Sequence, residues 1–197
     1  ASSGYNLGVD TLILARLGKR EQAGGIRAAA VRSSGDVREL QAALRDEDAS
    51  VRWAAVWNLT QRTAAAAESS AQLATSLRDP DPLVRGLAAV ALANCGCAQT
   101  ALDPLIGALA DSDVNVRQRA ADAIATAGKA AASAVPALIK AASSPDEEVQ
   151  AQRSLANALG AIGPAAGAAI PVLERMRGNP RGRPEAESAI ARIRGVQ

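Results

Sequence analysis

Residues 79–96 read DPDPLVRGLAAVALANCG, and this stretch decides the fold because three other parts of the chain repeat its pattern. The matching stretches are 46–61 (DEDASVRWAAVWNLTQ), 111–128 (DSDVNVRQRAADAIATAG) and 144–163 (SPDEEVQAQRSLANALGAIG). Their leading aspartates are 33 and 32 residues apart, and their closing glycines are 32 and 35 residues apart. A period of this length fits one pair of helices, and stacked pairs bury a continuous core. The sequence therefore predicts an all-α protein, a right-handed α-solenoid of about five helical hairpins.

Each stretch also carries the local signals that begin and end a helix. The predicted N-caps, whose side-chain oxygens accept orphan backbone N–H groups, are Asp48, Asp81, Asp113 and Ser144. Apolar residues then recur every four positions, as at Val84, Ala88 and Leu92, which predicts one buried helical face. A glycine ends the pattern at Gly96, Gly128 and Gly163. The fourth stretch is longer, and we expect one added turn in its second helix.

The repeat pattern also divides the chain into an array and a preceding segment. A shorter helix precedes each quoted stretch, so the predicted array covers 36–195. Its approximate repeats are 36–63, 67–96, 97–128, 129–163 and 164–195. Residues 1–35 are expected to form an atypical N-terminal cap, because the end units of such arrays usually differ from the others. Within this segment, residues 10–18 predict a short apolar helix, and residues 20–32 predict a second one.

The D-x-D-x-x-V-R turns and the closing A-L-x-x-x-G or A-I-x-x-x-G resemble HEAT repeats, in the variant also found in phycobilin lyases. The resemblance covers about 36–195 and is specific for the fold. It implies that the second helix of each hairpin lines a concave face. It also implies that the turn arginine bonds to a neighbouring repeat, which predicts a structural ladder of Arg52, Arg85 and Arg117. The alternative for these arginines is a basic stripe that binds phosphates.

The composition argues against several classes of function. The net charge is +2, whereas a dedicated nucleic-acid binder usually has a strongly basic face, so a nucleic-acid partner is not expected. The chain has no His and two Cys, so neither a metal site nor a cofactor is predicted. We expect Cys95 to be a buried thiol and Cys97 a loop thiol, because a bond between them would close a very tight ring. The paired aspartates are expected to cap turns, since calcium would need six to eight converging oxygens.

The compartment follows from the sequence less directly. No apolar run reaches the length of about 18 residues that a membrane-spanning helix requires. The many Ala, Gly and Arg residues are typical of a GC-rich bacterium. The chain starts at Ala1 and shows no signal peptide, which favours a mature exported or periplasmic protein over a cytoplasmic one.

Helical phase predicts which side chains of the second helices face outward on the concave side. The candidate partner-binding residues are Trp53, Trp57, Gln61, Val90, Gln118, Asp122, Arg153 and Asn157. Trp53 and Trp57 are four residues apart, share one helical face and are the only tryptophans. Exposed tryptophans are typical anchors of protein interfaces. The alternative is that residues 9–30 fold over them. A further cluster of arginines around RGNPRGR (177–183) is expected to be a solvated loop rather than an anion site.

Two classes of function remain. The first is a non-catalytic protein–protein interaction module, an adaptor or accessory subunit of a larger bacterial complex that binds its partner protein through the concave face. The alternative is a HEAT-like enzyme or enzyme subunit, either bilin-lyase-like or DNA-glycosylase-like. The glycosylase hypothesis would use Trp53, Trp57 and Asp122, but the inner positions lack a basic lining. Catalysis is not expected, because no convergent carboxylate pair or activated nucleophile is visible.

Overall fold

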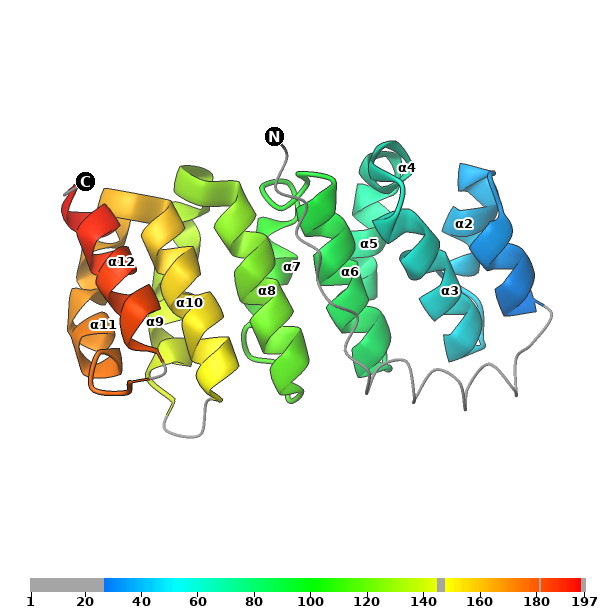
Figure 1. Ribbon diagram of the computed structural model, residues 1–197. Helices are drawn as coiled ribbons and strands as arrows, with labels where there is room; N and C mark the ends of the chain where they lie inside the picture. Colours follow the sequence, from blue (N-terminus) through cyan, green and yellow to red (C-terminus); the bar gives the residue numbers. More distant parts are fainter. Residues whose placement is uncertain (1–26, 145–147, 181, 196–197) are drawn as a thin grey trace.

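The computed structural model describes residues 27–144, 148–180 and 182–195, and within these ranges the chain is helical without a strand. Five hairpins stack side by side into an elongated two-layered array (Figure 1), which confirms the predicted all-α solenoid. The first two hairpins contain α2 (Val37–Ala43), α3 (Ala49–Thr60), α4 (Thr63–Glu68), α5 (Ser70–Ser76) and α6 (Pro82–Asn94). The third contains α7 (Leu102–Ala108) and α8 (Val114–Ala127). The last two contain η1 (Gly128–Ala134), α9 (Val135–Ala142), α10 (Val149–Ile162), η2 (Gly163–Ala169), α11 (Ile170–Met176) and α12 (Arg183–Arg194).

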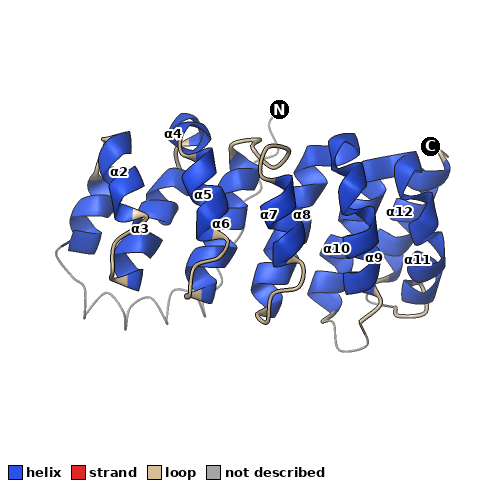
Figure 2. Ribbon diagram, turned by 180° about the vertical axis from the view of Figure 1, so that it is seen from behind, coloured by secondary structure: helices blue, strands red, loops and turns tan. Residues whose placement is uncertain are grey.

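The second helices of the hairpins form one layer and the first helices form the other. We call α3, α6, α8, α10 and α12 the inner layer, and α2, α5, α7, α9 and α11 the outer layer. Figures 1 and 2 show the two layers from opposite sides. Neighbouring helices of the inner layer contact each other far more extensively than those of the outer layer. The inner layer is therefore the more closely packed of the two layers.

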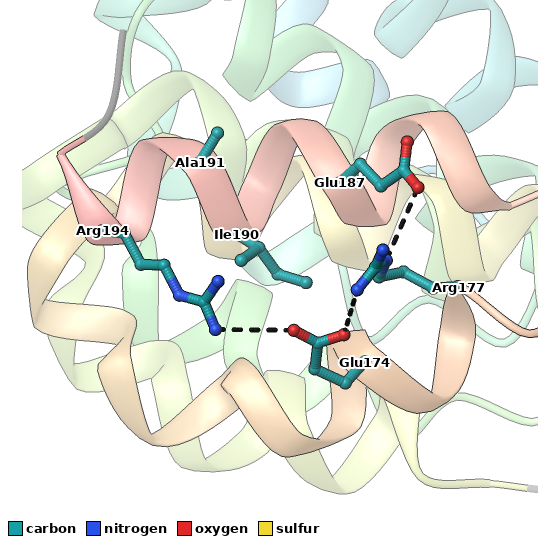
Figure 3. A pocket seen from close by; sticks show the side chains of 6 residues that line it. All are labelled: Glu174, Arg177, Glu187, Ile190, Ala191 and Arg194. Atoms are coloured by element: carbon teal, nitrogen blue, oxygen red, sulfur yellow. Dashed lines mark hydrogen bonds and ion pairs between the residues drawn. The ribbon is translucent and has the colours of Figure 1, made fainter.

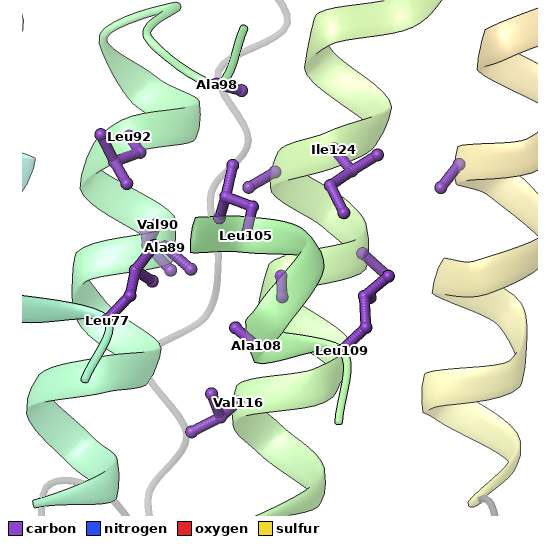
Figure 4. Packing of buried hydrophobic residues seen from close by; sticks show 14 of the residues in the cluster. Leu77, Ala89, Val90, Leu92, Ala98, Leu105, Ala108, Leu109, Val116 and Ile124 are labelled. Atoms are coloured by element: carbon purple, nitrogen blue, oxygen red, sulfur yellow. The ribbon is translucent and has the colours of Figure 1, made fainter. Parts of the chain in front are cut away.

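The core lies between the two layers and consists of small aliphatic side chains. Leu92, Leu105 and Ile124 come from three successive helices and are fully buried side by side (Figure 4). Alanines fill the remaining positions, and many of them are fully buried as well. Small side chains let helix axes approach closely, so this composition suits many short helices in contact.

The turns inside the hairpins are built by the paired aspartates. Asp81 is the N-cap of α6, and its carboxylate accepts the backbone N–H of Leu83 at 2.9 Å. The first aspartate, Asp79, accepts the N–H of Asp81 at 2.8 Å. The same two bonds recur at Asp46 with Asp48 and at Asp111 with Asp113. The predicted N-caps Asp48, Asp81 and Asp113 are therefore confirmed.

The fourth turn differs from its prediction. Helix α10 begins at Val149 with Glu148 as its N-cap, so the predicted N-cap at Ser144 is wrong. Helices α8 and α10 both have 14 residues, so the expected added turn in the helix is also wrong. The extra residues of the fourth repeat precede α10. The glycine signals at the other ends are confirmed, since Gly96, Gly128 and Gly163 have φ of 69°, 55° and 76°.

Two short 3-10 helices turn the chain between the layers in the C-terminal half. Each contains one residue outside the helical region, Ala131 in η1 and Ala166 in η2. The run Val149–Met176 is long and apolar enough to cross a membrane by composition. It comprises α10, η2 and α11, however, and it changes direction between the layers (Figure 1). It is part of the solenoid core, because 56% of its most apolar window is buried.

The N-terminal end of the described chain is held by α3. Residues 27–33 are helical. The buried Asn58 donates hydrogen bonds from Nδ2 to the carbonyl oxygens of Val31, Arg32 and Ser34 at 2.9, 2.9 and 3.0 Å. These carbonyls lie at or just after a helix end, where they lack intrahelical partners. The predicted helix at 10–18 and most of the expected cap at 9–30 lie outside the described residues.

Candidate functional site

The inner layer contains the predicted partner-binding residues. They lie on α3, α6, α8 and α10, apart from Gln61, which directly follows α3. The face divides into two parts along the array. The N-terminal part, over α3 and α6, contains the predicted positions Trp53, Trp57 and Val90. The C-terminal part, over α8 and α10, presents Gln118, Asp122, Arg153 and Asn157. Neighbouring inner helices are in contact, and we call the face that carries these predicted positions the strip.

The two tryptophans form a stacked pair at the N-terminal part of this strip. Their ring centroids are 5.5 Å apart and the ring planes differ by 15°. Trp57 is half-buried, whereas Trp53 is only 8% exposed and belongs to the hydrophobic core. The expectation that both rings are exposed is therefore wrong for Trp53. Helical phase sets the direction of the Cα–Cβ bond, but a long ring can fold back against its neighbours.

The remaining apolar candidate, Val90 on α6, is 7% exposed and also belongs to the core. The same helix carries Gly86 one turn earlier, and a Cβ at that position would lie 3.1 Å from Cδ of Arg119 on α8. The Arg119 side chain thus lies against α6 beside Gly86, where the glycine leaves room for it. Arg119 was not among the predicted residues, and no sequence signal distinguishes it.

The polar candidates have different surroundings. Gln61 and Asn157 are exposed, and Gln118 is half-buried. Arg153 donates from Nε to Oε1 of Glu185 on α12 at 2.5 Å and from Nη1 to Gln150 at 3.2 Å. Its side chain is 42% exposed. Burial alone would raise the pKa of Glu185, but the hydrogen bond from Arg153 and one from a backbone N–H hold it below its ordinary value. Arg153 is therefore a link between hairpins as well as a surface residue.

Asp122 is the titratable group nearest the middle of the strip. Burial raises its pKa, while a hydrogen bond with Ser154 and the positive charge of Arg119 oppose that rise. Ser154 lies on α10 and is buried. The hydroxyl of Ser154 and the carboxylate of Asp122 thus connect α8 to α10. Asp122 therefore contributes to the contact between α8 and α10.

The turn arginines lie in the first turns of the inner-layer helices α3, α6 and α8, and their guanidinium groups form hydrogen bonds within the protein. Arg85 donates from Nε and Nη2 to both carboxylate oxygens of Asp111 at 2.7 and 2.8 Å. Its Nη1 donates to the carbonyl oxygens of Asp79 at 2.7 Å and Pro80 at 3.1 Å. One guanidinium therefore joins its own turn to the turn of the next hairpin.

Arg52 and Arg117 occupy the equivalent positions. Arg52 binds both carboxylate oxygens of Asp79 at 2.7 and 2.9 Å, and it binds two carbonyls of its own turn. The hydrogen bond to Asp79 raises the pKa of Arg52, although burial alone would lower it. Arg117 donates to the carbonyl oxygens of Asp111 at 2.8 Å and Ser112 at 3.2 Å. The side chains of Arg52 and Arg85 are 13% and 14% exposed, which leaves little surface for a phosphate-binding stripe.

The arginines near the C-terminus surround a small pocket between α11 and α12 (Figure 3). Glu174 lies between Arg177 at 2.5 Å and Arg194 at 3.5 Å, and Arg177 also approaches Glu187 at 3.5 Å. The pocket has a volume of about 260 Å³, and Ile190 and Ala191 complete its lining. Arg175 and Arg183 make hydrogen bonds to Ser143 and to the Arg177 carbonyl, and residue 181 lies outside the described part. The residues that line the pocket come from two helices, so their spacing in the sequence did not predict it.

The two cysteines differ from their prediction. Cys95 and Cys97 form a disulfide with a Cα–Cα distance of 5.3 Å, so the expectation of two free thiols is wrong. Within the described ranges, no group of three or more His, Cys, Asp or Glu side chains is placed to hold a metal ion.

Comparison with known proteins places this geometry in a wider group. The family model for HEAT repeats matches residues 37–113 and 102–193. A chain in the complex of CpcE and CpcF of phycocyanin lyase from Nostoc sp. PCC7120 is 27% identical, with a TM-score of 0.70 over 81% of this chain and 65% of that chain. This chain thus spans less than two thirds of that subunit. None of the curated proteins matches the sequence.

Two further structures share the fold at lower identity. A designed armadillo repeat protein in complex with the peptide (KR)4 is 20% identical, with a TM-score of 0.68 over 95% of each chain. The karyopherin Kap121p, bound to the extreme C-terminus of the protein phosphatase Cdc14p, is 16% identical, with a TM-score of 0.67 over 93% of this chain and 23% of that chain. At these identities the similarity describes the fold alone.

Proposed function

Because this chain belongs to the HEAT-repeat family, we propose that it is a non-catalytic protein-binding module, an adaptor or accessory subunit that takes its partner protein on the inner layer. The observation that carries this proposal is the stacked tryptophan pair. Trp57 presents part of a large, rigid ring on the inner layer, and Trp53 supports it from below at a centroid distance of 5.5 Å. Aromatic rings held in this way are typical anchors of protein interfaces.

The size of the strip supports the same proposal. Five hairpins with four or five outward side chains each would offer roughly 20–25 residues, which is one side of a standard interface of about 800 Å² per partner. The strip also changes along its length from aromatic at Trp57 to polar at Gln118 and Asn157. Such a surface combines an apolar anchor with polar side chains that determine register, as specific interfaces do.

The test is affinity capture from the native source with wild type, Trp57→Ala and Ile106→Ala as baits. Trp57 is the informative site because it is half-buried, whereas Trp53→Ala would remove a core side chain. Ile106 on α7 is also half-buried and packs against the core, but it belongs to the outer layer, so Ile106→Ala is the matched control. The proposal expects one partner to bind wild type and Ile106→Ala and to be lost with Trp57→Ala. Equal capture by all three folded baits would contradict it.

The form of association can be measured separately. Gel filtration of the isolated chain distinguishes a free adaptor, expected to elute as a monomer, from an obligate subunit, expected to self-associate or aggregate. A monomer would favour the adaptor.

The similarity to the phycocyanin lyase complex favours one second candidate. The chain would then be a subunit of a bilin-lyase-like enzyme and would need a partner subunit to form a tetrapyrrole pocket. Mixing the chain, alone and with a captured partner, with a linear tetrapyrrole and recording the visible absorbance spectrum tests this candidate. An absorbance spectrum that shifts only in the presence of the partner would support this candidate. An unchanged spectrum in both mixtures would exclude it and favour the non-catalytic module.

A further inference from the structure

The disulfide between Cys95 and Cys97 closes a loop with a single residue, Gly96, between its ends. It follows directly after α6, with Cys95 as the C-cap residue. The binding proposal makes no use of this disulfide, and its two cysteines pack at the margin of the core.

The turn at Gly96 does not depend on the disulfide. Backbone hydrogen bonds form it, from Gly96 N–H to the Ala93 carbonyl at 3.1 Å and from Cys97 N–H to the Leu92 carbonyl at 2.9 Å. These bonds and the positive φ of Gly96 are the usual way in which a helix ends. Helices α8 and α10 end at Gly128 and Gly163 with the same sign of φ and without cysteines. Helices of this chain therefore also end at a glycine of positive φ where no covalent bond is present.

The disulfide also contributes little to the stability of the fold. A disulfide stabilises chiefly by restricting the unfolded chain, and this effect is smallest for the shortest loops. The loop after the disulfide is anchored in other ways, because Ala98 is 1% exposed and packs into the core near Leu92 and Leu105 (Figure 4). Thr100 adds a hydrogen bond from Oγ1 to the Cys97 carbonyl at 2.8 Å. Opening the S–S bond would leave these anchors in place.

The two sulfur-bearing residues are also accessible from solvent. Cys95 and Cys97 are half-buried, and Asn94, Gly96 and Gln99 around them are exposed. By contrast, Leu92, one turn earlier, is fully buried. A thiolate can therefore approach the disulfide from the edge of the stack without unfolding of the hairpin.

We propose that Cys95–Cys97 is a thiol–disulfide exchange site that accepts two electrons from a dithiol, either a small molecule or a protein. A thiolate of the dithiol attacks one sulfur, the S–S bond breaks, and its electron pair passes to the leaving cysteine sulfur, which takes up a proton. The second thiolate of the dithiol then attacks the mixed disulfide and releases the other cysteine as a thiolate, which is protonated in turn. The chain gains two thiols, and the dithiol becomes a disulfide. The reverse sequence oxidises a partner dithiol.

The first experiment equilibrates the full chain in buffers with different ratios of reduced to oxidised dithiothreitol and glutathione. Free thiols are alkylated and counted by mass spectrometry, and far-ultraviolet circular dichroism is recorded alongside. The proposal expects full conversion between disulfide and dithiol forms in native buffer, reversal on reoxidation and an unchanged helical spectrum. A disulfide that opens only after urea unfolds the chain, or two thiols that stay free in excess oxidised glutathione, would overturn it.

The second experiment uses Cys95→Ser and Cys97→Ser, each of which leaves one thiol. Each variant is incubated with oxidised glutathione, and the mixed disulfide is followed by mass. At least one variant is expected to form it in the native state at a rate within about tenfold of the same variant in urea, as an accessible sulfur requires. A native rate more than about a hundredfold slower in both variants would show that the sulfurs are closed to thiols. Circular dichroism of both variants identifies any that do not fold.

Discussion

The two halves of the inner layer are fastened by different means. In the N-terminal half, Arg52 and Arg85 each reach from one turn to the carboxylate at the next turn. In the C-terminal half, α10 carries Gln152 at the equivalent place, and its contact with α12 combines the Arg153–Glu185 ion pair with a close approach of the two backbones. A Cβ on Gly160 of α10 would lie 2.9 Å from Cα of Ala189 on α12. The difference shows that one repeat architecture can be held by paired charges that join successive turns, or by an ion pair together with small residues between its helices.

The N-terminal half, which we call the charged half because of its arginine–aspartate pairs, is expected to lose more stability than the C-terminal half on a single substitution. Arg85→Ala removes four hydrogen bonds and leaves the nearly buried carboxylate of Asp111 without its guanidinium. We expect the free energy of unfolding to fall by about 3 kcal/mol, since breaking a buried ion pair leaves an uncompensated charge. Urea unfolding followed by circular dichroism measures this loss. Arg85→Lys should recover only part of it, because an ammonium group cannot bind both oxygens and both carbonyls.

An ion pair at the surface provides the control for this prediction. Arg177→Ala removes contacts to Glu174 and Glu187, whose side chains are 37% and 50% exposed. Because exposed pairs contribute little, the melting temperature should stay unchanged within experimental error. A loss for Arg177→Ala as large as for Arg85→Ala would mean that burial does not distinguish the two sites.

The close-packed half can be tested with one chemical change at two glycines. Gly160→Ala would place a methyl group against Ala189, and we expect a loss of about 1–2 kcal/mol because α10 and α12 must move apart. Gly107→Ala on α7 meets no atom within 4 Å, so the better helix propensity of alanine should raise stability by up to about 1 kcal/mol. Thermal unfolding of both variants gives the comparison. Two changes of the same sign would refute the close contact at Gly160.

Acid should weaken the charged half through Asp111. Burial raises the pKa of Asp111, but the hydrogen bond from Arg85 and the backbone N–H of Asp113 hold it below its ordinary value. Between the folded pKa and the unfolded value of about 3.9, the unfolded state binds more protons. The stabilisation is therefore present above about pH 3.9 and is lost as pH falls through the folded pKa.

Unfolding free energies of wild type and Arg85→Ala across this acidic range measure the effect. Wild type should lose more stability on acidification than the variant, because the variant has already lost the pair. If the unfolding free energies of the two proteins fall in parallel with pH, the Arg85–Asp111 pair is not the cause of the acid sensitivity.

The smallest change is expected at Asp122, where the sign is opposite. Burial raises its pKa, so its charged form destabilises the folded state above the folded pKa, and this cost disappears as pH falls toward the unfolded value. Asp122→Asn keeps an acceptor for Ser154 and removes the charge. The melting temperature should rise slightly at neutral pH and not at acidic pH. A lower melting temperature at neutral pH would show that the attraction to Arg119 outweighs the cost of burial.

Local signals predicted most of the fold. Asp48, Asp81 and Asp113 could be identified as N-caps because capping involves atoms only two or three residues apart. The fourth turn misled the prediction because Ser144 stands in a sequence that looks like a cap, whereas α10 begins at Val149. A capping motif in the sequence marks a residue at which a helix can begin. Which of the possible residues begins the helix depends on how the helix packs.

The candidate site was predicted less well, for a related reason. Helical phase placed the candidates on the helices of the inner layer, but it could not predict how much of each side chain is exposed, and Trp53 and Val90 belong to the core. Trp53 is buried against its neighbours, and Arg153 is paired with Glu185 from a helix that lies 32 residues further along the chain. Such contacts depend on the distance between helices, which no local pattern encodes.

The sequence by itself determined the repeat, the helices, the capped turns and the glycine ends, because these rest on hydrogen bonds and side-chain spacing within a few residues. Only the tertiary structure decided the stacking of Trp53 on Trp57, the contact of Gly160 with Ala189 and the bond between Cys95 and Cys97. The first two depend on how side chains fill the space around neighbouring helices. The third depends on a turn that brings two Cα atoms to 5.3 Å, which Gly96 permits but does not require.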